Sequence, residues 1–207
     1  MAPPRLLAIA PDGWYADPDF AARLSTLRRQ TGQLGPRAAV YLRAHGWDTA
    51  LWLTHLAQLD LPDDLRVGIT LPVDIELPEA SEALLHAGVD FVHLTERDAD
   101  RPLAVWPPLQ VSRVCHDPAQ ARRRLQLGSD WLIVSPIFPT PSKPDATPLG
   151  LAALSAAVQA APGRVLALGG ITPENAELCL HAGAVGVAVQ RAAWTNASAL
   201  SSSLANA

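Results

Sequence analysis

Short runs rich in Val, Ile and Leu recur along the chain, with helix-like segments between them. A buried parallel strand reads as a continuous apolar run, because helices cover both faces of a parallel sheet. The runs predict eight strands, at 5–10, 38–43, 66–70, 90–94, 109–114, 131–135, 164–168 and 185–189. The connection around 101–108 has too many prolines for a full helix.

A weak internal repeat marks three junctions between a helix and the next strand. The segments LHAGVDFVHL, LQLGSDWLIV and LHAGAVGVAV each place a glycine where an apolar helix face stops. These glycines are Gly88, Gly128 and Gly183. A glycine there adopts a left-handed cap, and a buried strand follows two or three residues later. Repeated helix-to-strand junctions indicate a parallel sheet.

Eight such units are enough to close a barrel, whereas five or six would indicate an open doubly wound sheet. No glycine-rich nucleotide fingerprint follows the first strand, which weakens the open sheet further. We therefore expect an α/β protein with a single (β/α)8 TIM barrel over residues 1–207. The open sheet is the alternative.

The composition is typical of a globular chain, and its charge argues against nucleic acid as a partner. Apolar residues make up 49% and charged residues 17%, which is enough to fill a barrel and cover its helices. The net charge is −4, and the only basic run, 122–124, is assigned to a helix surface, so nucleic acid is not an expected partner.

The expected setting is cytoplasmic. No apolar stretch approaches the roughly 20 residues needed to cross a bilayer, and residues 1–10 lack the features of a secretory signal. Cys115 and Cys179 are expected to be reduced thiols. The oligomeric state stays open, a homo-oligomer included.

In a barrel, the chemistry lies at the carboxyl ends of the strands and in the loops after them. The seventh strand ends in LGGITPEN, where Gly169 and Gly170 let backbone approach a ligand and Thr172 with Pro173 is expected to open a helix. The eighth strand ends at Ala188, Val189, Gln190 and Arg191. Amides from these two neighbouring ends, together with the positive end of a following helix, predict a phosphate site. The alternative is that the two glycines only make a tight turn.

The loop after the sixth strand reads SPIFPTPSKP. Prolines stiffen it, and Thr140, Ser142 and Lys143 project hydroxyls and an ammonium that suit several anionic oxygens at once. A proline-rich surface loop without function is the alternative.

The segments PIFPTPSK at 136–143, LGL at 149–151 and LGGITPEN at 168–175 resemble the thiamin phosphate synthase and TenI family. The likeness is looser upstream but is traceable over nearly the whole chain. It implies a small (β/α)8 barrel that binds thiazole phosphate and, in a synthase, also a pyrimidine pyrophosphate.

For a synthase, the resemblance implies Mg²⁺ and a cationic cluster that take up the charge of the leaving pyrophosphate. Arg43 and the metal residue Asp98 match the family pattern. At the family's lysine, asparagine–aspartate and serine positions this chain instead has His45, Thr70 with Leu71, and Val114. One metal carboxylate is therefore missing.

For a TenI-like tautomerase, the resemblance implies proton transfer on a carboxythiazole phosphate without a cofactor. His116 matches the family's histidine after the fifth strand and suits proton transfer, while Arg43 would hold the substrate carboxylate. Tyr41, with Trp14, Tyr15 and Trp47, would stack on a flat heterocycle, although ordinary packing explains these aromatic residues nearly as well.

The departures from the synthase pattern favour the tautomerase. The first alternative is a thiamin phosphate synthase with an altered metal site, in which Mg²⁺ would be the cofactor. The second is a non-catalytic barrel that binds a thiamin precursor or serves a partner protein.

Overall fold

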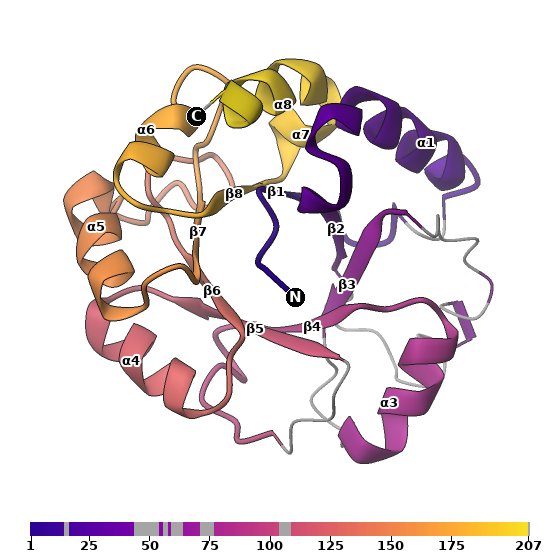
Figure 1. Ribbon diagram of the computed structural model, residues 1–207, viewed down its shortest axis with the longest axis horizontal. Helices are drawn as coiled ribbons and strands as arrows, with labels where there is room; N and C mark the ends of the chain where they lie inside the picture. Colours follow the sequence, from indigo (N-terminus) through magenta and orange to yellow (C-terminus); the bar gives the residue numbers. More distant parts are fainter. Residues whose placement is uncertain are drawn as a thin grey trace.

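The computed structural model describes residues 1–14, 17–43, 54–55, 58, 64–70, 77–103 and 109–206. Eight parallel strands close into a barrel in chain order (Figure 1). They are β1 (Leu6–Ala10), β2 (Ala38–Leu42), β3 (Arg66–Thr70), β4 (Phe91–Leu94), β5 (Gln110–Cys115), β6 (Trp131–Val134), β7 (Val165–Leu168) and β8 (Gly186–Val189). Each end lies within one residue of the predicted end, and the predicted barrel is confirmed.

Helices surround the strands as an outer ring (Figure 1). They are α1 (Phe20–Gln30), the 3₁₀ helix η2 (Gly32–Arg37), α3 (Leu77–His86), α4 (Pro118–Gln126), α5 (Gly150–Ala160), α6 (Ala176–His181), α7 (Arg191–Thr195) and α8 (Ala197–Asn206). Residues 95–103, the described part of the connection after β4, contain no helix, and the rest of the proline-rich stretch, 104–108, lies outside the described residues. No helix in the described part of the chain is long and apolar enough to cross a membrane.

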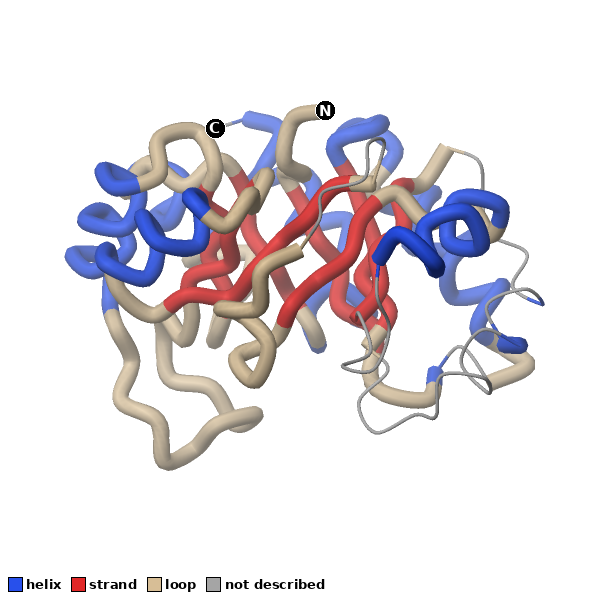
Figure 2. Tube along the Cα trace, turned by 90° about the horizontal axis from the view of Figure 1, so that it is seen from below, coloured by secondary structure: helices blue, strands red, loops and turns tan. Residues whose placement is uncertain are grey.

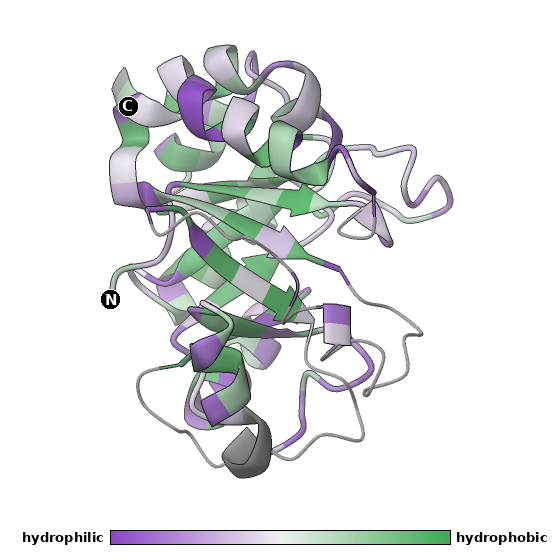
Figure 3. Cartoon of the chain, turned by 90° about the vertical axis from the view of Figure 1, so that its right-hand side faces the viewer, coloured by the Kyte–Doolittle hydropathy of each residue, from purple (hydrophilic) through white to green (hydrophobic). Residues whose placement is uncertain are grey.

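Side chains alternate between the barrel interior and the surface under the helices. One buried cluster collects residues of a single parity from strands around the ring, which places it inside the barrel. Its members are Leu7, Ile9, Ala39, Tyr41, Phe91, Trp131, Ile133, Leu166 and Ala188. Apolar strand residues of the opposite parity pack beneath the helices. Figure 3 shows the same division, with hydrophobic strands and a more hydrophilic outer surface.

The repeated glycines end helices as predicted. Gly88, Gly128 and Gly183 have φ of 75°, 85° and 97°, and the next strand begins three residues after each of them. Such positive φ values are the left-handed caps that release a helix into the following strand.

The N-terminal segment lies across the amino-terminal mouth of the barrel (Figure 1). The Gln110 side chain donates to the Met1 carbonyl at 2.7 Å, and Arg66 donates to the Ala2 carbonyl at 2.8 Å. Figure 2 shows both termini on this side and the longest loops on the opposite side. The carboxyl ends of the strands lie on the side away from the N-terminal segment.

Candidate functional site

The loop after β6 packs closely against the end of β7. The amides of Ile137 and Phe138 donate to the carbonyls of Leu168 and Gly169 at 2.9 and 3.0 Å. Gly169 has φ of 103°, and a Cβ there would lie 2.8 Å from Pro136. Glycine is therefore required at this strand end for close packing of the two loops, which is more than a tight turn requires.

Replacing Gly170 by alanine is expected to lower the free energy of unfolding by about 1–2 kcal/mol. Gly170 has φ of 65°, and a Cβ there would lie 2.8 Å from the Cβ of Phe138. Gly163→Ala is the matched control, because Gly163 has φ of 71° with nothing within 4 Å of an added Cβ. Urea unfolding of both variants measures the difference. Equal stabilities would show that close packing against the loop does not matter.

The turn after β7 differs from the prediction. Thr172 and Pro173 do not open the helix, because α6 begins at Ala176. The Asn175 side chain accepts from the Thr172 amide at 2.9 Å and donates to the Gly170 carbonyl at 2.9 Å, which ties the intervening residues into a turn. Because α6 has only six residues and α7 only five, a helix dipole is not part of the predicted phosphate site, which depends on loop amides and side chains.

The ends of β7 and β8 lie side by side, with Leu168 paired to Ala188. Ala188 and Val189 are buried, Gln190 is half-buried and Arg191 is exposed. The predicted phosphate site at these two ends has the required proximity, and phosphate binding there stays a prediction.

The predicted anion-binding residues after β6 form a turn at the surface. The Ser142 amide donates to the Thr140 hydroxyl at 3.4 Å, and the Lys143 amide donates to the Thr140 carbonyl at 3.1 Å. Thr140 is half-buried, whereas Ser142 and Lys143 are exposed. The turn brings the three groups onto one short segment, which is what binding of a multiply charged anion requires.

Arg43 follows β2 and already has a carboxylate partner in the protein. Its Nη2 lies 3.3 Å from Asp12 Oδ2, and about 29% of the Arg43 side chain is exposed. A substrate carboxylate or phosphate would have to share or replace Asp12. The role of Arg43 in anion binding stays a prediction.

Tyr41 is part of a polar layer inside the barrel. Its hydroxyl lies 2.7 Å from the Thr70 hydroxyl, and its ring meets His93 edge to face at 5.0 Å. Burial raises the pKa of the Tyr41 hydroxyl. His93 in turn lies 2.9 Å from the Ser112 hydroxyl, so it is a hydrogen-bonded core residue. Substrate contact by Tyr41 stays a prediction.

The aromatic residues expected to sandwich a heterocycle do not come together where the structure describes them. Trp14 packs edge to face against Trp194 at 5.2 Å, outside the cluster that contains Tyr41. Trp14 packs against the hydrophobic cluster beneath the helices, next to Trp194 of α7, and so lies away from the barrel interior. Tyr15, Trp47, His45 and Leu71 lie outside the described residues.

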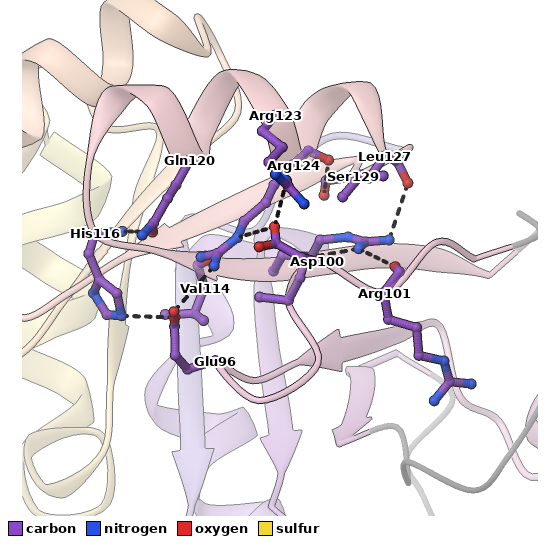
Figure 4. Close-up of polar contacts among 12 residues, drawn as sticks. Glu96, Asp100, Arg101, Val114, His116, Gln120, Arg123, Arg124, Leu127 and Ser129 are labelled. Carbon is purple, nitrogen blue, oxygen red and sulfur yellow. Dashed lines mark hydrogen bonds and ion pairs between the residues drawn. The ribbon is translucent and has the colours of Figure 1, made fainter.

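His116 follows β5 and contacts three segments of the chain, and Figure 4 shows its contacts with Glu96 and Gln120. Its Nε2 lies 3.0 Å from Glu96 Oε2, and its Nδ1 contacts the Ser135 carbonyl oxygen. Its amide donates to Gln120 Oε1 at 2.8 Å. The ring therefore has a fixed position between the loop after β4 and the end of β6.

Cys115, the residue before His116, points away from the site. Its thiol is buried beneath the helices, and burial raises its pKa to about 12. A neutral thiol on the opposite side of the strand cannot pair with the imidazole. Cys115 and Cys179 are both free thiols, as expected.

Two residues near His116, Glu96 and Arg124, were not among the predicted site residues. The assignment of 122–124 to a helix surface is wrong for Arg124, which is only 2% exposed. Arg124 follows the buried Ala121 by three residues and so lies on the same inward face of α4. That spacing could have indicated that Arg124 is buried. No local pattern indicates the contacts of Glu96, because its partners are distant in sequence.

The described residues do not fit Mg²⁺ well. Asp98 is half-buried in the loop after β4, but the Thr70 hydroxyl is bonded to Tyr41 and Val114 is apolar. Among the described residues, no three His, Cys, Asp or Glu side chains gather as a metal site would require. Mg²⁺ prefers several oxygen ligands in octahedral geometry, and this donor set supplies too few.

Comparison with known proteins places the chain in a family. Residues 69–193 match the family model TMP-TENI, thiamine monophosphate synthase. A thiamine-phosphate synthase of Bordetella avium is 34% identical, with 83% of this chain and 81% of that protein covered. One from Laribacter hongkongensis is 31% identical, with 87% and 86% covered.

Two further matches differ in what they cover. A thiamine-phosphate synthase of Gloeobacter violaceus is 36% identical, but the match spans 52% of this chain and only 33% of that protein. The structure of a thiamine phosphate pyrophosphorylase from Pyrococcus furiosus superposes with a TM-score of 0.72 at 22% identity, covering 97% of this chain and 95% of that one. The structural likeness supports the fold, and the family match with the sequence relatives supports the resemblance. The chain belongs to the thiamine monophosphate synthase family.

Proposed function

We propose that this chain is an enzyme of thiamin biosynthesis, a thiamine-phosphate synthase that couples a pyrimidine pyrophosphate to thiazole phosphate and releases pyrophosphate. The observation that carries the proposal is its similarity, over more than four fifths of both chains, to proteins named thiamine-phosphate synthase. This favours the first alternative of the sequence analysis over the tautomerase.

The anion-binding side of the rim supports the proposal. The turn with Thr140, Ser142 and Lys143 comes from the same loop whose base packs on Gly169 and Gly170. Hydroxyl and ammonium donors presented by such a turn stabilise the charge that develops on a departing pyrophosphate.

The residues at the positions where a synthase would bind Mg²⁺ differ from the family pattern. Because the described residues supply too few oxygen ligands for Mg²⁺, we assign the charge of the leaving group to protein cations, with Arg43 and Lys143 as candidates. Arg43 follows β2 and Lys143 lies in the loop after β6, so the two would approach an anion from different sides of the rim. Two such cations favour departure of a pyrophosphate electrostatically.

A TenI-type thiazole tautomerase is the second candidate, and the surroundings of His116 favour it. The ring lies between a carboxylate and a carbonyl, an arrangement that fixes an imidazole for proton transfer. This reaction does not need the side chains that a synthase has at the positions of Thr70 and Val114.

One experiment separates the candidates. Purified protein is incubated with thiazole phosphate and pyrimidine pyrophosphate, with and without Mg²⁺, and separately with the carboxythiazole phosphate tautomer. Thiamin phosphate formation supports the synthase. Isomerisation without thiamin phosphate formation overturns it in favour of the tautomerase. Thiazole phosphate binding without turnover in either assay would identify a non-catalytic barrel.

A further inference from the structure

We propose that Glu96 and Arg124 are positioning residues for His116, so that the two nitrogens of its ring have separate tasks. The inference rests on the proposed function, since both candidate reactions place the substrate at this rim. Figure 4 shows the chain of contacts, from Arg124 in α4 through Glu96 to the His116 ring.

The two ring nitrogens of His116 face acceptors of different kinds. Nδ1 contacts the Ser135 carbonyl oxygen, which can only accept, so Nδ1 carries a hydrogen in this arrangement. Nε2 lies 3.0 Å from the Glu96 carboxylate on the more open side, where 28% of the His116 side chain is exposed. Nδ1 is therefore the anchored nitrogen, and Nε2 is the one that can exchange a proton with a ligand.

Arg124 holds the other oxygen of Glu96. Arg124 Nη2 lies 3.3 Å from Glu96 Oε1, Nη1 donates to the Val114 carbonyl, and Nε lies 3.5 Å from Asp100 Oδ1. A guanidinium that is 2% exposed and contacts three groups has little freedom to rotate. Arg124 is buried and Glu96 is 54% exposed, so Arg124 gives the exposed carboxylate a fixed partner next to His116.

A second buried arginine fixes the loop that carries Glu96. Arg113 donates from Nη1 to the carbonyls of Ala99 and Arg101 at 3.0 and 2.8 Å, and from Nη2 to the Leu127 carbonyl at 3.1 Å. Burial lowers the pKa of Arg113 to about 10, with the neighbouring Arg124 contributing. The loop after β4 is thereby fastened to β5 and to the end of α4.

The start of α4 acts on the same histidine. The Asp117 side chain caps the helix by accepting from the Gln120 amide at 2.8 Å, and the Gln120 side chain accepts from the His116 amide at 2.8 Å. His116 is thus fixed through its backbone by the first turn of α4 and through its ring by Glu96, which Arg124 of the same helix holds. This concentration of contacts on one rim side chain favours a role in the site over simple packing.

The test compares Glu96→Gln and Arg124→Lys with the control Arg123→Lys. Arg123 lies on the same helix and contacts the same Asp100, but 64% of its side chain is exposed. In the reaction that the unmodified protein catalyses, Glu96→Gln is expected to lower kcat about tenfold or more while KM changes less than about threefold. Arg124→Lys is expected to lower kcat less, since one ammonium cannot replace three guanidinium contacts, and Arg123→Lys to leave it unchanged.

A spectroscopic measurement separates positioning from loss of fold and does not depend on turnover. In protein labelled with ¹⁵N-histidine, the Nδ1–H signal of His116, assigned with His116→Ala, is expected to be protected from exchange with water by the Ser135 carbonyl, and an Nε2–H signal is expected while the Glu96 carboxylate accepts from it. Glu96→Gln should lose the Nε2–H signal but keep that of Nδ1–H, whereas Arg123→Lys should keep both. An unchanged kcat or an unchanged Nε2–H signal in Glu96→Gln would overturn the inference. If the unmodified protein catalyses neither reaction, the proposed function fails and the N–H signals decide the positioning role.

Discussion

Replacing His116 by alanine is expected to lower kcat/KM about 10²- to 10⁴-fold, the range for loss of a proton-transfer group. The ring faces the open rim, with one nitrogen on the Ser135 carbonyl and the other on Glu96. In a tautomerase it would move the proton, and in a synthase its hydrogen would stabilise the leaving group. Steady-state kinetics with the active substrate pair measure the loss.

The control for this variant is His86→Ala. His86 is exposed at the end of α3, where its Nδ1 lies 2.9 Å from the Glu82 carbonyl oxygen. It should leave kcat/KM unchanged. Partial recovery of His116→Ala by added imidazole would support a chemical role, whereas retention of half the activity or more in His116→Ala would exclude one.

The barrel was predictable because its signal is local. A parallel strand covered on both faces must be apolar throughout, and a helix that turns into such a strand needs a left-handed cap. Gly88, Gly128 and Gly183 supply these caps, with φ between 75° and 97°. The closed barrel then places the ends of β7 and β8 side by side, as the predicted phosphate site requires.

The surroundings of His116 were not predictable, because they depend on contacts between distant segments. Glu96 lies 20 residues before His116, and its carboxylate has a structural meaning only once Arg124 is seen to be buried. A run of three arginines suggests a solvated surface, and only the spacing from Ala121 indicates otherwise. A charged residue can occupy an inward helix position when the carbonyls and carboxylates around it replace its water.

The two candidate reactions depend on different residues at the same rim of the barrel. Either reaction would use the predicted anion contacts of the loop that carries Lys143, since both substrates carry phosphate. The departures lie elsewhere, at Thr70, whose hydroxyl is bonded to Tyr41, and at Val114, whose side chain offers no donor. The relatives favour the synthase, whereas Thr70 and Val114 favour proton transfer. Measuring both activities therefore tests how far the residues of a family site can change while its predicted anion-binding residues stay the same.

The largest loss of stability is expected from Gly68→Ala, at about 3 kcal/mol in the free energy of unfolding. A Cβ on Gly68 of β3 would overlap the ring of Phe91, which is fully buried inside the barrel and meets Trp131 edge to face at 5.1 Å. The closed barrel leaves that ring little room to move, so the added methyl group strains β3 or β4. Urea unfolding measures the loss.

A double-mutant cycle with Phe91→Leu tests this cause. Phe91→Leu alone leaves a cavity and is expected to cost roughly 1–2 kcal/mol. In combination with Gly68→Ala it should cost less, because the smaller side chain makes room for the new methyl group, and the two changes should fall short of additivity by about 1 kcal/mol or more. Additive losses would mean that the alanine destabilises β3 through its backbone and not through the Phe91 ring.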